Sequence, residues 1–162
     1  MEKDYSGYRF TYFSSLTKQT VSSPTWKDLL PSDGAEHLFP ETSPSSHDIW
    51  WLDVRDPTEQ DVEAVSQFLD IHPLTAEDVI SRETREKVEP FRDYYLVSFQ
   101  TLVTGEDKDI PSSAGVYILV FRQGTVTFSP SGCGHVRRVQ ERIRRMHDPT
   151  VLSAYWICYA LM

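Results

Sequence analysis

Hydrophobic and polar residues alternate in several short stretches of the chain, which is the pattern of strands with one buried face. Residues 8–13 (YRFTYF) alternate aromatic and polar side chains and predict a first strand. Residues 49–54 (IWWLDV) and 94–103 (YYLVSFQTLV) predict two more. Residues 116–121 (VYILVF) form a continuous apolar run, which is typical of a central strand covered on both faces. The chain is therefore expected to build a sheet.

A second period, of three to four residues, predicts helices that bury one face. One helix follows the strand at 49–54 and ends near Asp70, and the next restarts at His72 and Pro73, with His72 as a turn residue or cap. Another, HVRRVQERIRRM, lies in the last third of the chain and turns its arginines outward. Its apolar stripe consists of Val136, Val139, Ile143 and Met146. Helices therefore follow strands along much of the chain.

Two local signals indicate where elements begin and turn. Asp56 precedes Pro57, with Glu59 close behind, and we interpret these as the N-cap, the first helical residue and the second member of a capping box. Gln123 and Gly124 separate the continuous apolar run from TVTF, and we interpret them as a tight hairpin turn in which glycine supplies a positive φ.

Together these elements predict an α/β fold with a mixed parallel and antiparallel sheet flanked by helices on both faces, an α/β/α sandwich. Residues 1–48 are expected to add the first strand, a Ser/Pro-rich connection and a short helix at TWKDLL to the same domain, whose core is residues 49–150. Residues 151–162 begin a further helix. Because that helix reaches Met162 without Gly, Pro or a basic last turn, we expect it to continue in a longer protein.

The composition is that of a globular domain, with 40% hydrophobic and 25% charged residues among 162. Lys and Arg number 16 against 24 Asp and Glu, so the net charge of −8 repels nucleic acid and attracts cations. Cys133 and Cys158 support neither a disulfide framework nor a zinc site, which favours a reducing compartment. No run of 18 apolar residues and no signal-peptide pattern occurs.

Two features could carry other chemistry and remain as alternatives. Cys133 and His135 could serve a soluble thiol-dependent enzyme, although side chains two positions apart in a Gly-rich turn rarely meet in the required geometry. The arginine-rich helix could bind nucleic acid, although it lacks interleaved aromatic residues and the chain is acidic. No phosphate-binding Gly-rich loop, HExxH motif or GxSxG motif occurs, so we expect no enzyme and no nucleic-acid partner. The tryptophans interpreted as core or interface anchors are Trp50, Trp51 and Trp156.

A succession of motifs begins at residue 50. The stretch WLDVRDPTEQDVEAVSQFLDIHPLTAEDVI contains a tryptophan strand, a D-P-T-capped helix, an H-P-L restart and a Glu-Asp pair in that order. It is followed by the segments EKVEPFRDYYLVSFQTL, GVYILVFRQGTVTFSP, HVRRVQERIRR and SAYWICYAL. In this order the motifs resemble the strands and helices of the CorA magnesium transporter family. The connector SRETREKVEPF is closer to the fungal Alr-type branch, which indicates a fungal source.

This resemblance implies the cytosolic domain of a homopentameric magnesium transporter, joined by a stalk helix to membrane helices absent from this sequence. The membrane would be the plasma or vacuolar membrane, with magnesium as both the transported ion and the regulator. Matched by position, the interfacial metal-binding carboxylate falls on Asp78, with Glu77 beside it, and its acidic partner on the neighbouring subunit lies beyond Met162. Without the resemblance, Glu77 and Asp78 are most simply solvated helix charges.

Overall fold

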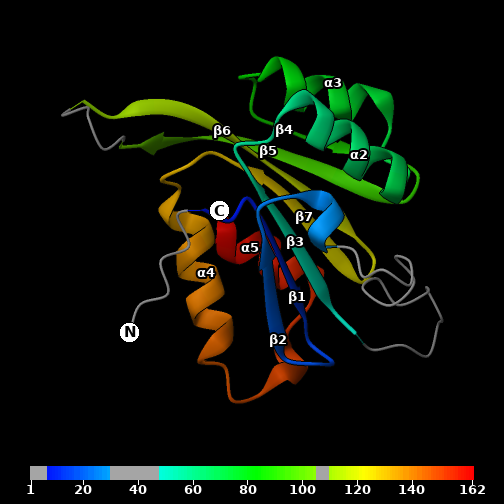
Figure 1. The fold of residues 1–162 in the computed structure, drawn as a ribbon, viewed down its shortest axis with the longest axis vertical. Coiled ribbons are helices and arrows are strands. Elements are labelled where there is room, and N and C mark those ends of the chain that lie inside the picture. Colours follow the sequence, from blue (N-terminus) through cyan, green and yellow to red (C-terminus); the bar gives the residue numbers. More distant parts are fainter. Residues whose placement is uncertain (1–6, 30–47, 105–109) are drawn as a thin grey trace.

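The computed structural model describes residues 7–29, 48–104 and 110–162. A seven-stranded sheet in the order β2-β1-β3-β7-β6-β5-β4 runs through the described residues (Figure 1). Its strands are β1 (Phe10–Ser14), β2 (Gln19–Ser23), β3 (Trp50–Arg55), β4 (Lys87–Pro90), β5 (Tyr94–Val103), β6 (Ser112–Phe121) and β7 (Gly124–Ser129). The helices are α1 (Trp26–Leu29), α2 (Glu59–Leu69), α3 (Pro73–Ser81), α4 (Gly134–Arg144), the 3-10 turn η2 (Pro149–Val151) and α5 (Ala154–Leu161).

Helices cover both faces of this sheet. Figure 1 shows α2 and α3 together on one side and α4 and α5 on the other. The short helix α1 joins the α2 side, where the Trp26 ring lies 5.5 Å from that of Phe68. Strands β3 and β7 pair in parallel, whereas the other neighbouring strands pair antiparallel. The predicted α/β fold, with a mixed sheet between two helical layers, is confirmed.

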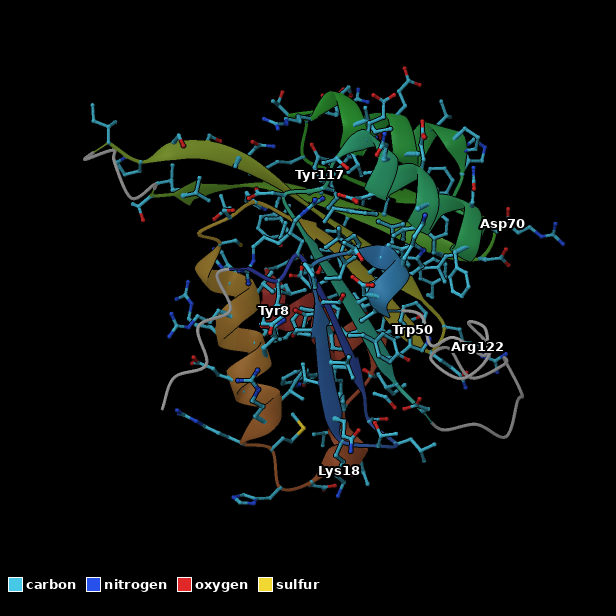
Figure 2. All side chains as sticks on the ribbon, viewed as in Figure 1. Tyr8, Lys18, Trp50, Asp70, Tyr117 and Arg122 are labelled. Carbon is cyan, nitrogen blue, oxygen red and sulfur yellow. The ribbon has the colours of Figure 1, made fainter. Side chains whose placement is uncertain are left out.

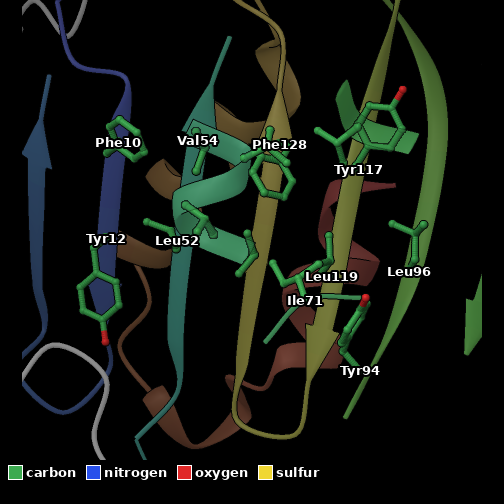
Figure 3. Packing of buried hydrophobic residues seen from close by; sticks show 14 of the residues in the cluster. Phe10, Tyr12, Leu52, Val54, Ile71, Tyr94, Leu96, Tyr117, Leu119 and Phe128 are labelled. Carbon is green, nitrogen blue, oxygen red and sulfur yellow. The ribbon is translucent and has the colours of Figure 1, made fainter. Parts of the chain in front are cut away.

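Two apolar cores form, one on each face of the sheet. Figure 3 shows the core under α2 and α3, in which Leu52, Phe128 and Leu119 from three adjacent central strands lie side by side. The other core holds the predicted stripe of α4, whose residues Val136, Val139 and Ile143 are buried. Strand β6 contributes to both cores, which confirms that the continuous apolar run is a central strand covered on both faces.

Two strands of the described sheet were not predicted by the hydrophobic pattern. Both lie at an edge: among the described residues, β2 pairs with β1 alone and β4 pairs with β5 alone. Strand β2 lies within the Ser/Pro-rich stretch that was expected to be a connection, and its first three residues are exposed. Strand β4 begins inside the charged connector. Each is held mainly by backbone pairing along one side, so neither carries a strong apolar signal.

The cap of α2 lies two residues later than predicted. Thr58 is the N-cap: its Oγ1 accepts from the Asp61 N–H at 3.2 Å, and Asp61 Oδ2 accepts from the Thr58 N–H at 2.8 Å. Asp56, predicted as the cap, instead has a left-handed backbone, φ 44°, and accepts from the Ser131 N–H at 2.8 Å. The prediction failed because two overlapping cap patterns begin at Asp56 and Thr58, and Asp56 is used to join two loops.

Gly124 does not supply the positive φ of the hairpin. It is the first residue of β7, whereas the left-handed glycine among the described residues is Gly132 at φ 73°. A Cβ at position 124 would lie 1.9 Å from Cε2 of Trp50, so the strand needs glycine here to make room for an indole ring. The predicted antiparallel hairpin of β6 and β7 is nonetheless confirmed.

Candidate functional site

Helix α3 carries the predicted metal-binding pair and is anchored at its beginning. His72 is its N-cap, as predicted, and the Nδ1 atom accepts from the Leu74 N–H at 3.1 Å. The hydroxyl of Tyr94 accepts from the His72 N–H at 3.1 Å and lies 2.7 Å from Thr75 Oγ1. Tyr94 is the buried first residue of β5 (Figure 3), so the sheet anchors the start of α3 through this phenol.

Asp78 forms an ion-pair cluster with two residues of β4. The Lys87 Nζ atom lies 2.6 Å from Asp78 Oδ2 and 2.8 Å from Glu89 Oε2. The Asp78 and Lys87 side chains are 20% and 17% exposed, so the pair lies in a partly covered position at the surface. The hydrogen bond to Asp78, followed by that to Glu89, raises the pKa of the Lys87 ammonium.

The end of α3 places this cluster beside a helix C-terminus. Arg82 is the C-cap in a left-handed conformation, and the Glu83 N–H donates to the Asp78 carbonyl at 2.9 Å. The Glu83 carbonyl in turn accepts from the Tyr117 hydroxyl at 2.7 Å, which fixes the turn to the sheet. The last turn of α3 contains no basic residue. Positive charge is favoured at a helix C-terminus, and Lys87 supplies it from the neighbouring strand.

Glu77, the other predicted ligand, does not belong to this cluster. Its side chain is exposed, whereas Asp78 is half-buried. Within the described ranges, no three His, Cys, Asp or Glu side chains come together closely enough to hold a metal ion. What Asp78 offers is a surface carboxylate that already binds a cationic group. This donor set is compatible with Mg²⁺, which takes one or two carboxylates and keeps several waters.

The alternative thiol site does not form in the described structure. Cys133 is buried, whereas His135 Nε2 lies 3.1 Å from Thr101 Oγ1 on β5. The imidazole also packs edge-on against Phe99, with ring centroids 6.1 Å apart. The side chain of Cys133 makes no capping hydrogen bond at the start of α4. The Cys133 thiol and the His135 imidazole therefore do not form a catalytic pair, as their spacing predicted.

Three arginines of α4 make local contacts. The Arg137 Nε atom lies 3.2 Å from Glu141 Oε1, and the Arg138 Nε–H donates to the Gly134 carbonyl at 3.1 Å. Arg142 lies over the Trp156 ring, with its Cζ atom 5.4 Å from the centroid. Trp156 thus joins α4 to α5, whereas Trp50 and Trp51 are buried in the two cores.

A buried carboxylate lies in the sheet at a position that the hydrophobic pattern did not single out. Asp53 on β3 is 2% exposed, and its Oδ1 accepts hydrogen bonds from Thr127 at 2.5 Å and Ser129 at 3.0 Å. The Trp51 indole N–H donates to the same Thr127 hydroxyl at 3.0 Å. Burial raises the pKa of Asp53 to about 6, although these hydrogen bonds and Arg55 act to lower it. In the sequence, Asp53 stands between the apolar strand residues Leu52 and Val54, and this position was the one indication that it is buried.

A cleft of about 670 Å³ opens where β3 and β7 end. These parallel strands lead into helices on opposite faces, β3 into α2 and β7 into α4, so the cleft lies at a switch point in the topology. It is lined in part by Thr58, Arg82, Gln100 and Ser129. Neither predicted ligand, Glu77 nor Asp78, lines it. The cleft and the Asp78 cluster are thus separate features.

No helix in the described ranges has both the length and the apolar character required to cross a bilayer.

Comparison with known proteins assigns the motifs to a family. Residues 46–162 match the family model described as "CorA-like Mg2+ transporter protein". The magnesium transporters ALR2 and ALR1 of Saccharomyces cerevisiae are each 37% identical to this chain over 155 residues. Those matches cover 95% of this chain and 18% of each relative. The chain thus spans about a fifth of the length of these curated relatives.

Solved structures share the fold. The soluble domain of CorA from Methanocaldococcus jannaschii superposes with a TM-score of 0.62 at 14% sequence identity. The match covers 94% of this chain and 53% of that domain. At this identity the likeness shows the fold, and the assignment of the family rests on the closer relatives and the family model.

Proposed function

Because this chain belongs to the CorA-like Mg²⁺ transporter family, we propose that it is the magnesium-sensing, regulatory part of a magnesium transporter. The membership confirms the resemblance predicted from the motifs after residue 50. In the proposal, the whole protein carries magnesium across a plasma or vacuolar membrane, and this domain lies on the cytosolic face. The proposed role is regulatory rather than enzymatic, in keeping with relatives that are named as transporters.

The observation that supports this proposal most directly is the cation-binding position of Asp78. The carboxylate is half-buried, lies near the C-terminus of α3 and already contacts an ammonium group at 2.6 Å. The carboxylate and the helix C-terminus both favour a positive charge at this point of the surface, and the Lys87 ammonium supplies one in this structure. The matched position in the motif is also the one at which the family resemblance places a metal ligand. Glu77 stands next to it on α3 and is exposed, where it can act through ordered waters.

A site of this kind suits a sensor rather than a permanent metal centre. Mg²⁺ gives up its water shell reluctantly, so a surface site with one or two carboxylates should bind on the order of 1 mM. If the second half of the site belongs to a neighbouring copy, the carboxylates of the two copies repel one another without the ion. Ion binding then favours the arrangement of copies that brings the carboxylates together, by the difference in its affinity for the two arrangements.

In the proposed assembly, five copies surround one pore and each contributes Asp78 to the contact with a neighbour. A low cytosolic magnesium concentration would free the carboxylates and let the copies move apart. The partner carboxylate is expected on a helix that follows residue 162 in the parent protein. The isolated chain therefore carries half of each site and is expected to be monomeric or weakly associated.

Replacing Asp78 with asparagine should weaken divalent-cation binding to this chain by about tenfold or more, because the charged ligand is lost while its shape is kept. Mn²⁺ is a suitable probe because it broadens NMR signals near its site. In the ¹⁵N-labelled chain, the amides around residues 77–89 should broaden first as Mn²⁺ is added, and Mg²⁺ should reverse the effect. The apparent dissociation constant follows from the titration.

The matched control for this variant is Asp70→Asn. Asp70 is the left-handed C-cap of α2, a conformation that asparagine also tolerates, and the change removes the same charge from the end of another helix (Figure 2). It should leave Mn²⁺ binding near Asp78 unchanged. Equal binding by the wild type and the Asp78→Asn variant would contradict the site. In the full-length transporter, the same substitution should shift the internal Mg²⁺ concentration at which ion influx into proteoliposomes shuts off.

A further inference from the structure

We propose that Lys87 is a built-in competitor that determines how much magnesium the Asp78 site requires, an inference that rests on the function proposed above. The Lys87 ammonium contacts both Asp78 and Glu89, at 2.6 and 2.8 Å. An ammonium group and a divalent cation seek the same carboxylate oxygens and repel each other at this range. Magnesium therefore gains full access to these oxygens only when Lys87 withdraws.

The position of Lys87 is determined by the sheet rather than by a flexible tail. It is the first residue of β4 and pairs with Ser98 of β5. Along β4, the side chains of Lys87 and Glu89 are partly buried and belong to the Asp78 cluster. The side chain of Val88 between them is 70% exposed. Because the backbone is tied to the sheet, the ammonium stays within reach of Asp78 at all times. Its effective concentration at the site is correspondingly high, as for any tethered ligand.

The competitor also resolves an electrostatic problem at the end of α3. Asp78 stands near the helix C-terminus, where a negative charge is unfavourable, and the last turn contributes no basic residue of its own. In the absence of metal, the Lys87 ammonium offsets the negative charges of Asp78 and Glu89 and so reduces the repulsion between these two carboxylates. The domain can thus exist stably with or without a bound ion, which a sensor must do.

The same geometry assigns Glu89 as a second candidate ligand, one that the motif did not indicate. Asp78 and Glu89 lie on different elements, yet both carboxylates contact a single Nζ atom. A small cation between them would reach two carboxylate oxygens and complete its shell with water, as Mg²⁺ prefers. Lys87 thus occupies the position that the ion would take. Its side chain can swing outward, since it remains 17% exposed.

Replacing Lys87 with glutamine should tighten Mn²⁺ binding at Asp78 by roughly three- to tenfold, because a competing positive charge within a few ångströms is removed. The Mn²⁺ titration of the labelled chain gives the dissociation constant for each variant, and Mg²⁺ displacement tests the physiological ion. Lys87→Arg keeps the charge and should bind Mn²⁺ as the wild type does. Adding Glu89→Gln to Lys87→Gln should remove much of the gain.

The matched control is Lys18→Gln, which changes the net charge equally at an exposed turn far from the cluster (Figure 2). It should alter the dissociation constant by less than about twofold, since distant surface charges are screened. If Lys87→Gln binds no more tightly than Lys18→Gln while Asp78→Asn still weakens binding, Lys87 is only a surface ion-pair partner and the inference is overturned. If Asp78→Asn has no effect, the proposed site itself fails. The amide spectrum of each variant confirms that it is folded.

Discussion

Replacing Gly124 with alanine is expected to lower the free energy of unfolding by about 3 to 5 kcal/mol, the range for loss of a buried tryptophan from a core. The new Cβ would lie 1.9 Å from Cε2 of Trp50, and two more ring atoms lie within 2.3 Å of it. The indole is 8% exposed and packs against Phe121, so it cannot turn aside without leaving the core. Urea denaturation followed by circular dichroism measures the loss.

Two controls separate this clash from a general effect of removing a glycine. A Cβ at Gly7 would have nothing within 4 Å, so Gly7→Ala should change stability by less than about 0.5 kcal/mol. In a Trp50→Leu background the ring is gone, and Gly124→Ala should cost at least about 2 kcal/mol less than in the wild type. An equal cost in both backgrounds would show that backbone conformation, and not contact with Trp50, requires glycine.

Gly124 also illustrates what the sequence could and could not predict. A glycine after an apolar run is typical of a hairpin turn, and the hairpin was found where the pattern placed it. The reason for the glycine was different, because it depends on a ring from β3, which is distant in the sequence. Local sequence patterns predict backbone conformation and burial well. They do not record which side chain will approach from a neighbouring strand.

The elements predicted best are those whose burial gives the sequence a clear period. Strand β5 has the predicted bounds, Tyr94–Val103, and the buried positions of α4 are the predicted stripe. The edge strands β2 and β4 were missed because solvent covers much of their surface and backbone pairing suffices to hold them. The spacing of hydrophobic residues thus predicts the central strands of this sheet but not its edge strands.

The candidate site was predictable only in part, for a related reason. Asp78 and Glu77 were identified by their place in a family motif, and the structure leaves their metal-binding role as a proposal. Lys87 and Glu89 were hidden inside a charged connector, nine and eleven positions further on. The alternation of Lys87, Val88 and Glu89 was the one local signal that two of these charges share a face. Lys87 and Glu89 are brought to Asp78 by the turn that follows α3. The local sequence pattern gives no information about this long-range contact.

A second large effect is expected from Asp53, whose burial makes folding depend on pH. The pKa of this carboxyl is raised from 3.8 to about 6 in the folded chain, and burial is the main cause. The folded state therefore binds the proton more tightly than the unfolded state. The resulting stabilisation is fully present below about pH 4 and is lost as the pH rises through 6. A shift of about two pKa units corresponds to roughly 3 kcal/mol.

Comparison with Asp53→Asn isolates this contribution, because asparagine cannot ionise but keeps a carbonyl oxygen for Thr127 and Ser129. The difference in the free energy of unfolding, wild type minus Asp53→Asn, should rise by about 2 to 3 kcal/mol between pH 8 and pH 4. Urea titrations at each pH measure both proteins. A flat difference for Asp53 would mean that its hydrogen bonds and Arg55 fully offset the cost of burying its charge.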